Sequence, residues 1–189
     1  WLWIKKHAKH LMPPVDEALQ ARFDEGNAFE PFVESLFPNL VNVGFNSYSE
    51  YLDMPERTME AWRNGAEVVS QGRYETGSIT CISDLVRRDG DAFILIEIKS
   101  SSSAKKEHAL DLAFQKIVVE GAGYRIKKCE VAHVDTSYIR AGDIKPKELA
   151  AFTDITQDVE DLIEGTKARI EQALLIANSH EMPNPAPEK

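Results

Sequence analysis

Hydrophobic positions follow two different periods along the chain, and the change of period separates helical from extended segments. Apolar residues in Val15–Leu36 recur at helical spacings among charged residues, which predicts an amphipathic helix that Pro31 kinks or divides. Residues 1–12 predict a short helix closed by Pro13-Pro14, and a last amphipathic helix is expected from about Thr156 to Asn178. Both ends of the chain are therefore predicted to be helical.

The middle of the chain has the composition of strands. β-Branched and aromatic residues concentrate in Val68–Tyr74, Ile79–Arg87 and Ala92–Lys99. Turn-forming residues separate these runs at Glu75-Thr76-Gly77 and Asp89-Gly90-Asp91. This pattern predicts three consecutive antiparallel strands joined by short turns.

A helix and a fourth main strand are expected after these three. Ser100–Ser103 can cap a helix from about Ala104 to Glu120, which ends at Gly121-Ala122-Gly123. Strand character returns in Tyr124–Val134. The remaining segments are residues 38–46, a loop or short strand, and Met54–Asn64, a helix.

Together these segments predict one α/β domain over residues 1–180, with a mixed central sheet flanked by helices. The 189 residues, 43% hydrophobic and 28% charged, suffice for one compact core and exclude global disorder. Residues 181–189 are rich in proline and predict a tail or linker. Because the first residues resemble the middle of a helix or strand, we expect a fragment of a longer polypeptide that carries further domains.

The cysteines and the apolar runs indicate in which compartment of the cell the protein is expected. Cys81 and Cys129 show no metal-binding or redox spacing, which predicts free thiols in the reducing cytoplasm. The longest apolar run, around Phe93–Ile96, is far shorter than the roughly 20 residues of a membrane-spanning helix. The sequence therefore predicts no contact with a membrane.

The formal net charge of −9 argues against a protein that coats DNA. The acidic excess is uneven, because residues 147–189 carry nine acids and four bases. Residues 97–128 carry seven bases and four acids, a local excess of three positive charges. Electrostatic attraction is short-ranged at physiological salt, so this segment can still contact phosphates.

The second hairpin brings two carboxylates and a lysine together. If Gly90-Asp91 are its two loop residues, paired positions sum to 181, and Asp84 lies directly opposite Glu97. Their Cβ atoms are then about 4.5–5.5 Å apart. A turn at Asp89-Gly90 would instead make the pair diagonal, at about 7–8 Å. Lys99, two residues after Glu97, points to the same face.

Two facing carboxylates amid apolar sequence destabilise a fold unless something neutralises them. A divalent cation would do so, with waters completing its coordination. Lys99 could then orient or deprotonate an attacking water, or stabilise charge on a phosphate. The alternative is that these three residues form the salt-bridged solvent face of an ordinary strand.

Asp84, followed on the next strand by Glu97-Ile98-Lys99, resembles the signature of the PD-(D/E)xK nuclease superfamily. The expected element order also resembles the αβββαβ core of its restriction-endonuclease-like fold. Gly26 followed by Glu30 before the sheet, and Gln115 on the helix after it, resemble the RecB-like exonuclease branch. That branch includes the CRISPR-associated RecB-like exonucleases, and the chain looks most like a poorly characterised bacterial family within it. The aromatic residue expected four positions after Gln115 is replaced by Val119.

The resemblance implies hydrolysis of DNA phosphodiester bonds with Mg²⁺ or Mn²⁺, by an exonuclease of DNA repair or defence. It implies that Lys99 positions the nucleophilic water and that Gln115 holds Lys99 or a phosphate. No iron–sulfur cluster is expected within this chain, because the four cysteines that hold one in related exonucleases are missing. The implied metal ligands are Glu30, Asp84, Glu97 and the backbone carbonyl of Ile98.

Single- or double-stranded DNA is the expected partner. Arg73 and Tyr74, just before the first turn, could pair or stack with nucleic acid, and Lys105, Lys106 and Lys116 could contact phosphates. The alternative function is a non-catalytic nucleic-acid or protein interaction module on the same fold.

Overall fold

The computed structural model of the chain describes residues 2–12 and 28–183. Most of the helix expected in Val15–Leu36, including Gly26, lies outside the described residues. Its end is described as α3, Glu30–Glu34. The proline-rich residues 184–189 also lie outside.

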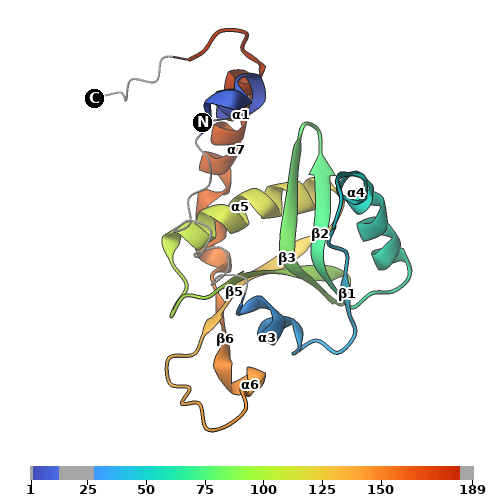
Figure 1. Cartoon of the computed structure of the whole chain (residues 1–189), viewed down its shortest axis with the longest axis vertical. Helices are drawn as coiled ribbons and strands as arrows, with labels where there is room; N and C mark the ends of the chain where they lie inside the picture. Colours follow the sequence, from blue (N-terminus) through green and yellow to red (C-terminus); the bar gives the residue numbers. More distant parts are fainter. Residues whose placement is uncertain (1, 13–27, 184–189) are drawn as a thin grey trace.

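A six-stranded mixed sheet forms the centre of the molecule, with the strands in the order β1-β2-β3-β4-β5-β6 (Figure 1). The β1–β2 and β4–β5 pairs are parallel, and the other neighbours are antiparallel. The mixed sheet predicted from the sequence is confirmed. The strands are β1 Leu40–Asn42, β2 Val68–Thr76, β3 Ile79–Asp89, β4 Ala92–Lys99, β5 Ile126–Val134 and β6 Ala150–Asp154.

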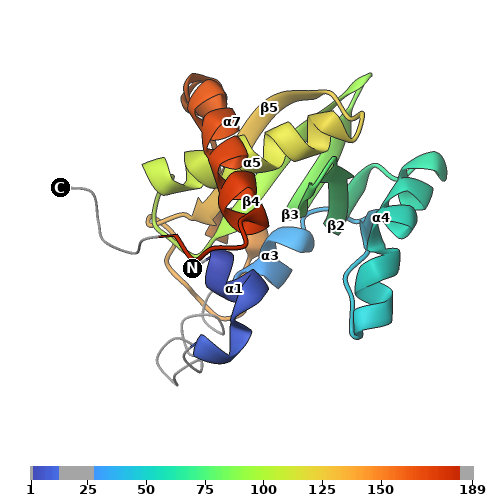
Figure 2. The ribbon, with the colours of Figure 1, turned by 90° about the horizontal axis from the view of Figure 1, so that it is seen from above.

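Helices lie on both faces of this sheet (Figures 1 and 2). On one face, buried residues of α4, α5 and α7 pack on strand residues such as Val86 and Leu95. On the other face, α3 supplies Val33 against Leu85 and Ile96. The helices are α1 Leu2–His7, the 3₁₀ helix η1 Lys9–Leu11, α3, α4 Tyr48–Arg63, α5 Lys106–Gly121, α6 Pro146–Leu149 and α7 Thr156–Asn178.

The start of α5 differs from its prediction. The helix begins at Lys106, with Lys105 as the N-cap residue, so the serines before it are not the cap. Instead, His108 Nδ1 accepts a hydrogen bond from the Lys105 backbone N–H at 3.2 Å. Ser101 uses its hydroxyl to bond the Ser103 carbonyl at 2.9 Å, which stabilises the loop before the helix.

The hairpin register matches the first of the two predicted turns. Asp89 pairs with Ala92 across Gly90-Asp91, and Leu85 pairs with Ile96. Beyond Leu85 and Ile96 the β3–β4 ladder ends, although both strands continue. β3 stays paired with β2, and β4 stays paired with β5. The sheet therefore opens between β3 and β4, next to the predicted catalytic residues.

The part of the chain that the structure describes contains no helix with both the length and the apolar character needed to cross a membrane.

Candidate active site

The opening between β3 and β4 is bridged by a side chain. Asp84, one residue beyond the last ladder pair on β3, accepts a hydrogen bond at Oδ2 from the Ile98 backbone N–H of β4, at 2.8 Å. A strand N–H that loses its ladder partner needs another acceptor. Asp84 supplies that acceptor, so its carboxylate is fixed beside β4 before any ligand binds.

Both oxygens of Glu97 are engaged by protein groups. Lys99 Nζ lies 2.6 Å from Glu97 Oε1, and Gln115 Nε2 of α5 donates to Glu97 Oε2 at 2.6 Å. The Glu97 side chain is 7% exposed, whereas that of Lys99 is 35% exposed. Gln115 therefore holds Glu97, whereas the resemblance implies that it holds Lys99 or a phosphate. The other polar atom of its amide group, Oε1, is buried and has no hydrogen-bond partner among the described residues.

Glu30 reaches the same neighbourhood from α3. Its Oε1 accepts a hydrogen bond from Gln71 Nε2 of β2. The register places Gln71 across from Asp84, between the pairs Ser70–Leu85 and Gly72–Ser83. Its backbone has φ of 50°, in the left-handed region that strains a residue other than glycine. Sequence reasoning missed Gln71, because alternation alone does not reveal a local distortion of a strand.

The electrostatics show that the three carboxylates influence one another. Burial, followed by the charge of Glu97, raises the pKa of Asp84 to about 7. Burial also raises the pKa of Glu30, against the hydrogen bond from Gln71, and the charge of Glu97 adds to the increase. Burial disfavours the Lys99 ammonium, but the charge of Glu97 and its hydrogen bond outweigh this and raise the Lys99 pKa. Lys99 therefore stays protonated at neutral pH.

The carboxylate oxygens of the site are the kind of ligand that a hard divalent cation binds, but the side chains do not surround a common point. Among the described residues, no group of three or more His, Cys, Asp or Glu side chains surrounds a common point. Mg²⁺ commonly takes only one or two protein carboxylates and completes its octahedron with waters and phosphates. Asp84 and Glu97 supply two such carboxylates, whose mutual repulsion a cation would relieve. The roles of Glu30 and the Ile98 carbonyl as further ligands stay predictions.

Arg73 and Tyr74 are not free to meet a substrate. Tyr74 is 2% exposed, and its hydroxyl accepts a hydrogen bond from Trp62 Nε1 at 3.1 Å. Arg73 is 9% exposed, bonds the Tyr51 carbonyl at 2.8 Å and lies over the Tyr51 ring. Both side chains are structural, contrary to the expectation from the sequence. Because the two residues precede a turn, the sequence suggested that they are exposed to solvent, but α4 covers β2 there.

The three lysines expected to contact phosphates divide into two kinds. Lys116 is buried, donates to the Ile126 carbonyl at 2.9 Å and pairs with Glu160 of α7 at 3.0 Å, so it joins α5 to its neighbours. Its expected contact with substrate is therefore wrong. Lys105 and Lys106 are exposed at the start of α5 and remain available to a phosphate.

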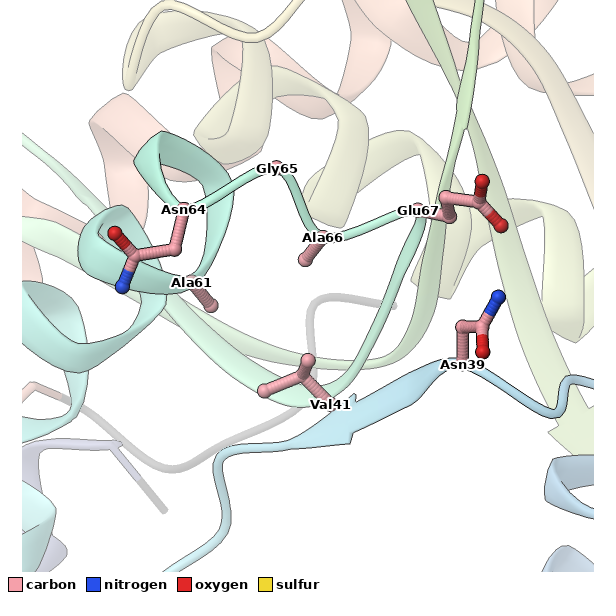
Figure 3. Close-up of a pocket in the computed structure, with 7 residues that line it drawn as sticks. All are labelled: Asn39, Val41, Ala61, Asn64, Gly65, Ala66 and Glu67. Carbon is pink, nitrogen blue, oxygen red and sulfur yellow. The ribbon is translucent and has the colours of Figure 1, made fainter.

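Two hollows in the surface lie away from the candidate site. One of about 360 Å³ lies between β1 and the end of α4 (Figure 3), where Glu67 is the only ionisable side chain drawn. A larger one of about 690 Å³ lies between α5 and α7 and includes Lys105 and Lys106 in its lining. Neither is lined by Asp84, Glu97 or Lys99, so the candidate site is defined by its chemistry and not by either hollow.

Comparison with known proteins adds little to this geometry. Neither a family model nor a curated protein matches the chain. Among solved structures, the chain is similar to an alkaline exonuclease (LHK-Exo) from Laribacter hongkongensis, with 16% identity and a TM-score of 0.29. The match covers 87% of this chain and 88% of that chain. The mixed sheet with helices on both faces is compatible with a restriction-endonuclease-like fold, and the functional argument rests on the site itself.

Proposed function

We propose that the chain is a divalent-metal-dependent nuclease that hydrolyses DNA phosphodiester bonds as an exonuclease. One observation carries the proposal: Asp84, Glu97 and Lys99 meet where β3 and β4 part, and the first two are acidic groups held close together despite their like charges. Such an arrangement costs folding free energy, and strain of this kind is typical of functional sites.

Each residue of the site has a distinct role in the proposed reaction. Asp84 and Glu97 would hold Mg²⁺ or Mn²⁺, with Glu30 close enough to sense their charge. When bound, such a cation polarises a phosphoryl oxygen and lowers the pKa of a coordinated water. Gln115 keeps Glu97 oriented through the bond to Oε2.

Lys99 is proposed to act as a cation rather than as a base. While it is paired with Glu97, its raised pKa keeps it protonated, and in that state it can donate hydrogen bonds but cannot accept a proton from water. It would therefore orient the attacking water or balance the charge that develops on the phosphate. Of the roles that the sequence left open, these two are proposed, and deprotonation of the water is not.

The test is degradation of end-labelled single- and double-stranded DNA in the presence of Mg²⁺ or Mn²⁺. We expect Lys99→Ala to lower the rate at least about a hundredfold, as the loss of an electrostatic donor does in other hydrolases. The matched control is Lys127→Ala, whose lysine pairs with Asp89 at 2.8 Å at the far end of the hairpin. Equal activity of Lys99→Ala and wild type, or no activity with either metal, would contradict the proposal.

A second candidate function is a non-catalytic nucleic-acid or protein interaction module. One observation favours this function: Lys99 and Gln115 already contact both oxygens of Glu97. The carboxylate is therefore satisfied by protein groups alone. Calorimetric titration with Mn²⁺ separates the two. A purely structural network should bind no Mn²⁺, whereas a nuclease site should bind it and lose it in Asp84→Asn.

A further inference from the structure

A fourth carboxylate faces the catalytic lysine from α5. Asp111 lies one turn before Gln115, and its Oδ2 is 3.8 Å from Lys99 Nζ. The Asp111 side chain is 56% exposed, so it is not tied down by packing. The resemblance assigns no role to this residue, and no role for it follows from the hairpin pattern.

Lys99 and the proposed cation compete for Glu97. Lys99 holds Glu97 Oε1 and Gln115 holds Oε2, both at 2.6 Å. Each Glu97 oxygen keeps a second lone pair for a cation, but a cation on Oε1 would lie close to the positively charged Lys99 ammonium and repel it, whereas the Gln115 amide is uncharged. Gln115 is buried, whereas Lys99 is partly exposed on a flexible four-carbon stem, so Lys99 is the group that can move.

A displaced ammonium needs a new anionic partner. Next to a divalent cation it would be repelled, and without a partner it would either leave the site or keep Glu97 occupied. The neighbouring His108 cannot serve, because an imidazole carries no negative charge and its acceptor nitrogen, Nδ1, already accepts the Lys105 N–H. Asp111 is the carboxylate near Lys99 that the cation does not need.

We propose that Asp111 is a positioning residue that receives the Lys99 ammonium when Glu97 binds the cation. Asp111 then keeps Lys99 directed at the reacting phosphate, and Glu97 is freed for the metal. The proposal rests on the proposed nuclease function. It assigns no contact between Asp111 and the substrate or the cation.

The test is a double-mutant cycle on Mn²⁺ affinity, measured by calorimetry without DNA. The four proteins are wild type, Asp111→Asn, Lys99→Met and the double variant. Asp111→Asn should weaken Mn²⁺ binding about fivefold when Lys99 is present, because Lys99 then has only Glu97 as partner. In the Lys99→Met background, the same change should have an effect of less than about twofold.

Two controls keep the outcome specific. Glu107→Gln removes a carboxylate from the first turn of α5 that is 71% exposed and lies near Lys105, and it should leave Mn²⁺ affinity unchanged. Asp111→Glu preserves the charge and should restore most of the affinity. On DNA, Asp111→Asn at saturating Mn²⁺ should lower kcat about tenfold with little change in KM, because Lys99 is misplaced in the reacting complex.

The possible failures are distinguishable. If Asp111→Asn weakens Mn²⁺ binding equally in both backgrounds, Asp111 acts only as a nearby negative charge and the inference is overturned while the nuclease proposal stands. An unchanged affinity in Asp111→Asn has the same consequence. If wild type binds no Mn²⁺, or Asp84→Asn binds it equally well, the metal site itself fails and the inference falls with it.

Discussion

The Asp84 carboxylate has two opposite effects on the stability of the fold. Its Oδ2 replaces a missing ladder acceptor for Ile98, which stabilises the fold, while its charge is buried beside Glu97, which destabilises it. Burial and the charge of Glu97 raise its pKa to about 7, which is the expected consequence of the second effect. The proposed cation would remove that cost, so the site would be more stable with the cation bound.

Replacing Asp84 with asparagine should stabilise the metal-free protein at high pH. Between pH 4 and 7 the folded protein binds a proton at Asp84 that the unfolded chain has released, so this contribution to stability is lost as pH rises. Asparagine removes the buried charge but keeps an oxygen for Ile98. We expect the midpoint of thermal unfolding to rise by about 3–8 °C at pH 8.

The same variant should show a smaller gain at pH 5, because only part of the loss in wild-type stability, which begins near pH 4, has occurred at that pH. Thermal unfolding followed by circular dichroism, with chelator present, measures both values. A gain of equal size at the two pH values would show that charge is not its cause.

The residues that could be predicted were those set by local geometry. The register of one hairpin is enough to bring Asp84, Glu97 and Lys99 close together, and the observed pairs follow that register as far as Leu85 and Ile96. The ladder ends there, so Asp84 and Glu97 do not form the directly opposite pair that the sequence predicts. Gln71 and Asp111 could not be found this way, because they enter the site through a strand distortion and through the packing of α5. Tyr74 was wrongly assigned to substrate binding, because the residue that covers it, Trp62, lies on α4 and not in the hairpin.

At the level of elements, the position of α5 is set where its last turn meets β2. A Cβ added to Gly121 would lie 2.6 Å from Thr76 Oγ1 and 2.7 Å from Thr76 Cβ. This close approach fixes one end of the helix that carries Asp111 and Gln115. The glycine is therefore needed for packing, and the residue with left-handed backbone after the helix is Gly123.

Gly121→Ala should destabilise the protein by about 1–3 kcal/mol, because the threonine or the helix must shift. The matched control is Gly165→Ala on α7, where nothing lies within 4 Å of the added Cβ. There, the better helix propensity of alanine should stabilise by about 0.5–1 kcal/mol. Urea unfolding measures both changes, and a neutral Gly121→Ala would show that α5 can move freely on β2.

The elements differ in how well the sequence predicts them. α7 begins and ends at the residues expected, because its apolar period is long and uninterrupted. β6, Ala150–Asp154, was not expected, because a five-residue edge strand has little pattern of its own and depends on pairing with β5. The cap of α5 was misassigned because serine is a frequent cap, whereas here Lys105 occupies the cap position and His108 in the first turn accepts its backbone N–H.

For the whole molecule, the distribution of exposed charge indicates where the DNA of the proposed function would approach. The local positive excess of residues 97–128 includes Lys116, which is buried, so the exposed excess depends more on Lys105 and Lys106. These two follow the loop that leaves β4 directly after Lys99. DNA that reaches the opening between β3 and β4 is therefore expected to pass the start of α5.

Replacing both Lys105 and Lys106 with alanine should weaken DNA binding and its dependence on salt. Loss of two phosphate contacts should reduce the slope of log Kd against log salt concentration by about 1–2. Fluorescence anisotropy at several salt concentrations, with Ca²⁺ to suppress cleavage, measures the slope. Lys145→Ala and Lys147→Ala, on and beside α6, serve as controls, and an unchanged slope in the Lys105/Lys106 variant would exclude this path.

The bond from Ile98 to Asp84 also makes the backbone a sensor of the site. An amide proton changes its resonance when its acceptor gains a proton or turns to a cation, so the Ile98 signal would follow the state of one carboxylate without any label on it. Selective ¹⁵N labelling of isoleucine would make this signal visible in a titration. The β3–β4 ladder ends at the site, and for that reason the Ile98 amide bonds Asp84. The signal of that amide would thus report directly whether the site holds a cation.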